Sequence, residues 1–297
     1  MWHRLRARLV SRFWARALAA GDPAMWLGEP RVRRRVNQRI SGHPDQWPLD
    51  WLADTLRTDE PFQHALSLGC GTGPLERDLL RRDLCRSMLA IDLSPDLIEL
   101  ARQQAESEGL GDRVRYRVAD LDRLTVADLA DSPGSTSPQF DAVFFHQSLH
   151  HVAALESCLD VVATVLAPGG VLYLDEYVGP SRNEWDDEAM RAMREVYAEL
   201  PETVRRAKQI RPPVDWRDPS EAVRSSAIAS LVASRFDVVT RRDYGGNLLA
   251  FLYGNLRSDV VATETGQAVL DELLDLEDEM LAAGAASYYA VILARKS

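Results

Sequence analysis

Three of the six histidines stand close together in the sequence, His146, His150 and His151. They lie at the end of a predicted strand and the start of the segment that follows it. With an unperturbed pKa of about 6.5, a histidine can take a proton from a hydroxyl group near neutral pH. Asp175 and Glu176 end another predicted strand, where a carboxylate can orient a histidine or bind a hydroxyl. These residues favour general base chemistry, although a histidine can also cap a helix or pack, and the carboxylates can be solvated loop charges.

A glycine-rich segment is the most informative feature of the chain, because residues 65–73 read Ala-Leu-Ser-Leu-Gly-Cys-Gly-Thr-Gly. An apolar strand leads into it, and a helix is predicted from Leu75 to Arg82. Glycine lets a backbone turn sharply and approach a ligand closely. The dinucleotide pattern needs glycine where this chain has Pro74, and the phosphate-loop pattern needs a lysine that is absent here. The segment therefore predicts a nucleotide-type pocket of another kind.

Acidic residues follow the next two predicted strands. Asp92 ends the apolar segment 88–91, about 20 residues beyond the glycine loop, where a carboxylate can accept both hydroxyl hydrogens of a ribose. It can equally cap the helix predicted from Asp96. Residues 114–119 alternate as a strand does and end at Asp120.

The order and spacing of these motifs resemble the class I S-adenosylmethionine (SAM)-dependent methyltransferases. The G-x-G-x-G pattern resembles the first motif of the family, and the L-x-P-G-G turn at residues 166–170 before a strand is another of its marks. The resemblance covers about residues 60–180 and implies SAM as the cofactor.

The resemblance also implies roles for individual residues. The implied cofactor-binding residues are Gly69, Cys70, Gly71 and Gly73 in the loop, Asp92 and Leu93 at the ribose, Asp120 and Leu121 at the adenine, and His146 along the cofactor. The segment from Ser148 to His151 resembles one in sugar and natural-product O-methyltransferases, so His150 or His151 is the expected base, aided by Glu176. The sequence does not separate the two histidines. No clustering of histidine, cysteine and carboxylate along the chain suggests a metal, so none is expected.

The family implies an α/β fold with a Rossmann-like, seven-stranded, mostly parallel sheet and an antiparallel last strand. We expect the last strands at residues 236–241 and 288–294, with a helix at 264–282 beside them. Two further helices are predicted at residues 184–200 and 219–234.

These helices suggest two additions to the catalytic fold. Residues 1–60 are expected to form an N-terminal helical segment that docks on the core or acts as a lid, and residues 61–297 the methyltransferase domain. Residues 180–235 within it form a helical insertion after strand five, expected to cap the substrate. Residues 1–20 carry an apolar stripe between arginines, which is also compatible with contact with a membrane surface. Docking on the core or a lid is the favoured interpretation.

Net charge and cysteine content limit the classes of partner and the cellular compartment that we expect. The net charge is −10, but ten arginines give the first forty residues +8. The remaining body is acidic, which argues against a nucleic-acid substrate. The three cysteines have no paired spacing, so we expect free thiols, as in proteins of a reducing compartment. Arginines interrupt any apolar leader, so we expect a cytoplasmic protein. The arginine-rich segment is also compatible with a homodimer contact.

The sequence therefore predicts a SAM-dependent methyltransferase acting on a small molecule, with a hydroxyl of a saccharide or specialised metabolite as the favoured acceptor. A nicotinamide oxidoreductase is disfavoured by the glycine spacing. Two alternatives remain: a non-catalytic SAM-binding partner or regulator, and a methyltransferase acting on a membrane lipid-linked substrate.

Overall fold

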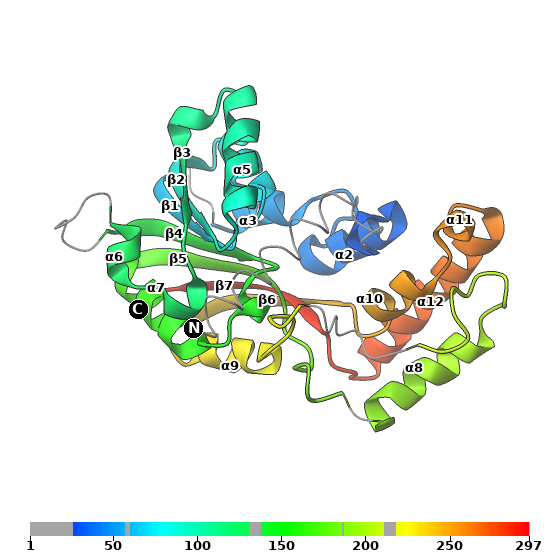
Figure 1. The fold of residues 1–297 in the computed structure, drawn as a ribbon. Helices are drawn as coiled ribbons and strands as arrows, with labels where there is room; N and C mark the ends of the chain where they lie inside the picture. Colours follow the sequence, from blue (N-terminus) through cyan, green and yellow to red (C-terminus); the bar gives the residue numbers. More distant parts are fainter. Residues whose placement is uncertain (1–25, 57–59, 131–137, 186, 211–217, 297) are drawn as a thin grey trace.

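The computed structural model describes residues 26–56, 60–130, 138–185, 187–210 and 218–296. Within them, seven strands form one sheet in the order β3-β2-β1-β4-β5-β7-β6, and β7 runs antiparallel to both neighbours (Figure 1). The strands are β1 (Phe62–Leu68), β2 (Cys85–Asp92), β3 (Val114–Val118), β4 (Phe140–His146), β5 (Leu166–Tyr177), β6 (Asp237–Gly245) and β7 (Tyr289–Arg295). This sheet confirms the predicted fold class.

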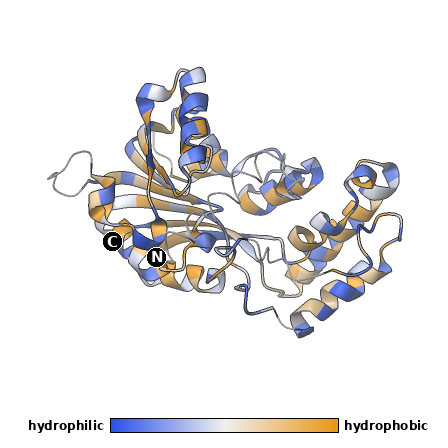
Figure 2. Cartoon of the chain, viewed as in Figure 1, coloured by the Kyte–Doolittle hydropathy of each residue, from blue (hydrophilic) through white to orange (hydrophobic). Residues whose placement is uncertain are grey.

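Helices cover both faces of the sheet because its strands are apolar on both sides. Successive side chains of a strand point to opposite faces, and Phe144 and Phe145 accordingly belong to two different hydrophobic cores. Figure 2 shows hydrophobic residues along the central strands. One core includes residues of α2 (Pro30–Ser41), α3 (Pro48–Leu56), α4 (Pro74–Arg81) and α5 (Pro95–Ser107), and the other includes residues of α6 (Val126–Leu129), α7 (Leu155–Val165) and α9 (Ile228–Ala233).

A second group of helices lies beyond the ends of β6 and β7 (Figure 1). It contains α8 (Asp187–Glu199), α10 (Leu249–Leu252), α11 (Ser258–Val261) and α12 (Glu264–Ala282). Short 3₁₀ turns complete the fold: η1 (Trp26–Gly28), η2 (Gly111–Arg113), η3 (Leu121–Arg123), η4 (Leu149–His151), η5 (Ser225–Ala227) and η6 (Tyr253–Asn255).

The helix predicted at residues 264–282 is confirmed as α12, and the one at 184–200 forms α8 over a shorter range. The helix predicted at residues 219–234 is wrong over its first half. Asp218 Oδ1 accepts the N–H of Ser220 at 2.8 Å, which fixes a turn before the segment. A side chain that bonds the nearby backbone competes with helix formation. Only Ile228–Ala233 is α-helical there.

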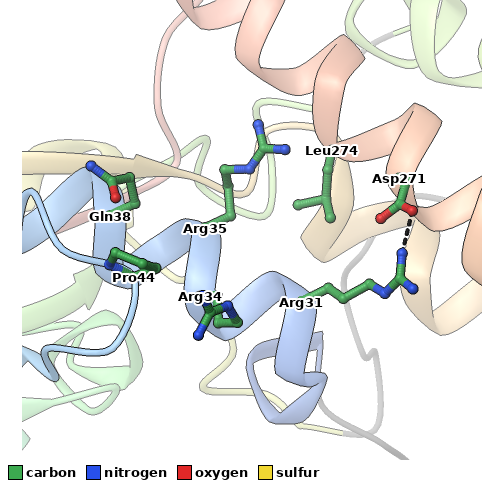
Figure 3. A pocket seen from close by; sticks show the side chains of 7 residues that line it. All are labelled: Arg31, Arg34, Arg35, Gln38, Pro44, Asp271 and Leu274. Atoms are coloured by element: carbon green, nitrogen blue, oxygen red, sulfur yellow. Dashed lines mark hydrogen bonds and ion pairs between the residues drawn. The ribbon is translucent and has the colours of Figure 1, made fainter.

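The described part of the N-terminal segment packs against the C-terminal helices. Val32 of α2 is fully buried, and Arg31, Arg35 and Arg39 of this helix pair with acidic side chains of α12. A hollow of about 390 Å³ lies between these helices. Among its lining side chains, Figure 3 shows Arg31 reaching Asp271. Arg35 pairs with Asp275 at 2.9 Å. The apolar stripe of residues 1–20 lies outside the described residues, so the lid and the domain division stay predictions.

Among the described helices, none combines the length and the apolar character that crossing a membrane requires.

Candidate active site

The glycine loop between β1 and α4 has a left-handed backbone at all three glycines, with φ of +80° at Gly69, +54° at Gly71 and +74° at Gly73. A side chain at Gly69 would put its Cβ 2.4 Å from Cβ of Ser148, so this glycine lets the loop pack against the residues that follow β4. A Cβ at Gly71 would meet nothing within 4 Å. Open space therefore lies beside the loop at Gly71, where a ligand can approach the backbone.

Asp92 ends β2 with its carboxylate against this loop. Its Oδ2 accepts the N–H of Gly71 at 2.9 Å, and its Oδ1 accepts the N–H of Ser94 at 2.8 Å. Burial raises the pKa of Asp92, although these hydrogen bonds act in the opposite direction. Leu93 also donates its backbone N–H to this carboxylate. An ionised carboxylate can accept about four hydrogen bonds, so some acceptor capacity is left for a ligand hydroxyl. Ser94 is the N-cap of α5, and Leu93 lies half-buried between the two.

The other residues predicted near the cofactor follow β3 or lie in the loop. Asp120 Oδ1 accepts the N–H of Asp122 at 3.0 Å, and this turn begins η3. Asp120 and Leu121 are both half-buried. Cys70 is buried, and burial raises the pKa of its thiol well above the ordinary value. The thiol therefore stays protonated, in agreement with a small packing residue in the loop.

The chain turns sharply where β4 ends. Gln147 has a φ of +52°, which is uncommon for a residue other than glycine, and its N–H donates to the carbonyl of Asp175 at 2.8 Å. The Asp175 carboxylate also accepts the hydroxyl of Tyr244 at 2.5 Å. His146 is 47% exposed, with its Nε2 3.7 Å from Asp175 Oδ2. Asp175 thus holds the ends of β4 and β5 together.

Glu176 is fully buried and binds the turn that carries the paired histidines. Its Oε1 accepts the N–H groups of Ser148 and Leu149, each at 2.6 Å. Its Oε2 lies 2.8 Å from Nδ1 of His150. Because a carboxylate only accepts hydrogen bonds, Nδ1 carries the proton. In the neutral ring Nε2 is then the nitrogen that can accept a hydrogen bond or a proton. This is the pairing that the sequence anticipated for Glu176 without knowing which histidine it joins.

The Glu176–His150 pair shifts the pKa of both groups. Burial alone would lower the pKa of His150, but the hydrogen bond and the charge of Glu176 raise it above its ordinary value. Burial alone would raise the pKa of Glu176, but His150 and the two backbone N–H groups lower it. The carboxylate therefore stays ionised and favours a proton on the imidazole.

His151 has different surroundings, although its ring centroid lies only 4.2 Å from that of His150. Its Nδ1 lies 3.2 Å from Oγ of Ser220 and 3.7 Å from Oδ2 of Asp218. Burial, and after it the charge of His150, lowers the pKa of His151. The two neighbouring histidines are thus tuned in opposite directions.

A cavity of about 140 Å³ opens beside His150. Glu221 is a second ionisable group on its wall, and five aromatic rings make up most of the rest: Tyr177, Trp185, Phe251, Tyr288 and Tyr289. Trp185 belongs to the segment that was expected to cap the substrate. Its ring packs against those of Phe251 and Tyr288, with centroids 5.4 and 5.8 Å apart. The start of that segment is therefore part of the pocket wall.

Glu277 of α12 supports the same cavity from outside. Its Oε1 accepts the N–H groups of Gly246, Leu248 and Leu249 at 2.9–3.0 Å, and its Oε2 accepts a hydrogen bond from Arg39 at 2.8 Å. Gly246 lines the cavity. This buried carboxylate therefore connects α2 and α12 to the pocket wall.

Sequence reasoning missed Glu221, Asp218 and Glu277. The Asp-Pro-Ser sequence at residues 218–220 is a turn signal and could have placed Glu221 in a loop. Nothing in the sequence links either acid to His151, nearly seventy residues away. Glu277 lay within a correctly predicted helix, where an acidic residue is expected to be exposed.

Known proteins resemble this chain in its central part. A family model described as a methyltransferase domain matches residues 66–174. The ubiquinone biosynthesis O-methyltransferase of Xanthomonas campestris pv. campestris is 35% identical over 126 residues, which cover 42% of this chain and 47% of that protein. The enzyme of that name from Xylella fastidiosa is 35% identical over 138 residues, covering 44% and 51%. The chain thus spans about half the length of these curated relatives.

A solved structure resembles the chain over nearly its whole length. Geranyl diphosphate C-methyltransferase from Streptomyces coelicolor A3(2), in complex with Mg²⁺, geranyl diphosphate and S-adenosyl-L-homocysteine, has a TM-score of 0.54 and 17% identity, and the match covers 98% of each chain. At this identity the likeness establishes a shared fold.

Proposed function

Because the chain carries a methyltransferase domain of the class I SAM-dependent family, we propose that it transfers a methyl group from SAM to a hydroxyl group of a small molecule. The observation that carries the proposal is the Glu176–His150 pair, which stands beside an aromatic cavity at the carboxyl ends of β4 and β5. Ligands of open α/β sheets bind outside this edge.

The residues around the glycine loop fit the cofactor of the family. The open space at Gly71 and the remaining lone pairs of Asp92 suit a ribose, while Asp120 and Leu121 are proposed to contact the adenine. Leu93, His146 and the rest of the loop are proposed to line the same site. SAM supplies the methyl group and a neutral sulfide as the leaving group.

His150 is the proposed base. Glu176 holds the proton on Nδ1, so Nε2 can take the proton that the acceptor hydroxyl loses as its oxygen bonds to the methyl carbon. Glu176 acts through His150 and is a positioning residue. Nδ1 of His151 lies near Ser220 and Asp218, and its lowered pKa makes this histidine the weaker base. Beyond proton removal by His150, the rate acceleration is proposed to come mainly from aligning the acceptor oxygen with the methyl group of SAM.

The acceptor is proposed to be a ring-bearing small molecule, such as a saccharide or a specialised metabolite. Aromatic side chains stack well on rings, and the cavity of about 140 Å³ is similar in size to cavities of about 150 Å³ that hold benzene. The O-methyltransferase names of the curated relatives support oxygen as the acceptor atom.

The outer segments have proposed roles at the same site. The contribution of Trp185 to the cavity supports a substrate-capping role for residues 180–235. The contact of Glu277 with Arg39 supports a link between the N-terminal segment and the pocket. We retain the lid, the homodimer and a cytoplasmic location as proposals.

Calorimetry with S-adenosylhomocysteine tests the cofactor assignment. We expect micromolar binding by the wild type and an affinity about 10²-fold lower for Asp92→Ala, because hydrogen bonds to a charged group contribute about 1.5–3 kcal/mol each. Unchanged affinity in the variant would refute the ribose assignment.

Turnover with labelled SAM and a panel of hydroxylated acceptors tests the reaction. His150→Gln should reduce kcat by about 10²–10⁴-fold, whereas His43→Gln, at an exposed histidine of the loop after α2, should have no effect. Equal turnover by the wild type and His150→Gln would contradict the proposed base. Cofactor binding without turnover on any acceptor would favour a non-catalytic SAM-binding protein.

A further inference from the structure

A group of potential metal ligands lies at the wall of the aromatic cavity, which His150 and Glu221 line. One ligand atom each from His150, His151 and Glu221 lies within 4.8 Å of the other two. Glu221 comes from the turn before η5, and the histidines from η4. The spacing of residues along the chain offers no reason to expect this group, because metal-site patterns rely on ligands that are close in sequence.

The orientation of His150 is the one found in metal-binding histidines. Glu176 binds its Nδ1 at 2.8 Å, which leaves Nε2 as the donor atom. Histidines that bind metals almost always donate their other ring N–H to a carboxylate, carbonyl or water, which fixes the tautomer and increases the basicity of the ligand. Nε2 of His150 makes no hydrogen bond to any residue of the described chain.

Two further carboxylates lie near His151, those of Asp218 and Glu221. Asp218 is fully buried, and its Oδ2 has no hydrogen-bond partner among the described residues although it lies 3.7 Å from Nδ1 of His151. Glu221 Oε2 lies 3.9 Å from the same nitrogen. With Glu176, three carboxylates lie near the two imidazoles, and the guanidinium of Arg182 donates to the backbone carbonyl of Asp218 at 3.3 Å. A buried carboxylate oxygen without a partner is costly, so a cation next to Asp218 Oδ2 would offset that cost.

We propose that His150, His151 and Glu221 bind one divalent transition-metal cation of the Zn²⁺ or Co²⁺ type, with Asp218 as a second carboxylate next to His151. Two imidazoles and one carboxylate suit these metals, whereas Mg²⁺ and Ca²⁺ prefer oxygen ligands. With metal–ligand distances of about 2.0–2.1 Å, tetrahedral ligand atoms lie about 3.3 Å apart. Glu221 is only partly buried and can close the remaining distance by rotation.

The consequence of metal binding rests on the proposed function. A cation on Nε2 of His150 occupies the lone pair that would take the proton of the acceptor. It also lies between His150 and Glu221, which line the cavity. Metal and acceptor therefore compete, and the metal inhibits methyl transfer.

Titration of the full-length protein with Co²⁺ tests the site directly, because Co²⁺ in a four-coordinate site has a visible absorption spectrum. After treatment with a chelator, the wild type should bind one equivalent. His151→Asn and Glu221→Gln should each bind at least tenfold more weakly. Glu188→Gln, which changes an exposed carboxylate of α8, is the matched control and should bind as the wild type does. Binding of S-adenosylhomocysteine by each variant verifies that it is folded.

Absence of saturable Co²⁺ binding would overturn the proposal, as would equal affinity in the wild type and both site variants. Methylation by the metal-free protein is measured separately. If it is absent while one Co²⁺ binds at these residues, the proposed function fails and the metal site stands. If Co²⁺ raises turnover instead of inhibiting it competitively with the acceptor, the competition at His150 is refuted.

Discussion

Replacing Glu76 by glutamine should stabilise the protein at pH 8 and have little effect at pH 4.5. Glu76 lies in the first turn of α4, behind the glycine loop, and is fully buried. Its Oε1 accepts a hydrogen bond from the hydroxyl of Ser67, but its Oε2 has no hydrogen-bond partner among the described residues. Burial is the main cause that raises its pKa from 4.5 to about 7.

The direction of the effect follows from proton binding. The folded protein holds this proton more tightly than the unfolded chain does, so unfolding releases it between pH 4.5 and about 7. Stability is complete below the unfolded pKa and falls as the pH rises through the folded one. Each pKa unit corresponds to about 1.4 kcal/mol, so ionised Glu76 costs about 3 kcal/mol above pH 7. Glutamine has a similar shape and cannot ionise.

Denaturant unfolding of the wild type and Glu76→Gln at both pH values measures this difference. The variant should be more stable by up to about 3 kcal/mol at pH 8 and nearly equal at pH 4.5. Glu60→Gln, at an exposed position before β1, should change stability at neither pH. If Glu76→Gln is no more stable than the wild type at pH 8, or differs equally at both pH values, the burial argument is refuted.

Three further substitutions probe the site. Gly69→Ala should weaken binding of S-adenosylhomocysteine by at least tenfold in calorimetry, because its Cβ would lie 2.4 Å from that of Ser148 in a loop with a φ of +80°; unchanged affinity would contradict the close approach of the two loops. Glu176→Gln should lower kcat by about 10²-fold or more with little change in cofactor affinity, because a neutral amide can donate to Nδ1 of His150 and no longer holds the proton there by charge; an equal loss of both would indicate a structural role. Glu277→Ala should reduce the free energy of unfolding by about 3–5 kcal/mol, because an arginine and three backbone N–H groups lose their buried acceptor; thermal unfolding within about 1–2 °C of the wild type would exclude that contribution.

The sequence by itself determined the framework of the molecule. The strand before Gly69, the loop and the helix after it follow from local preferences, because apolar runs, glycines and helix starts act over a few residues. The same holds for α12, whose predicted range agrees with the structure. In the segment before α9 the turn at Asp218 overrode a helical pattern. The local prediction fails there because one side chain offers the backbone a competing hydrogen bond.

Only the tertiary structure distinguished the paired histidines. Neighbours in sequence have almost the same local surroundings, so spacing left His150 and His151 with equal standing. The sheet brings Glu176 to one ring, and the loop after α8 brings Asp218 and Glu221 to the other. The pKa of a buried group depends on charges within a few ångströms, whatever their distance along the chain. The fold therefore decides which imidazole is bound by a buried carboxylate, and the sequence decides only that two are present.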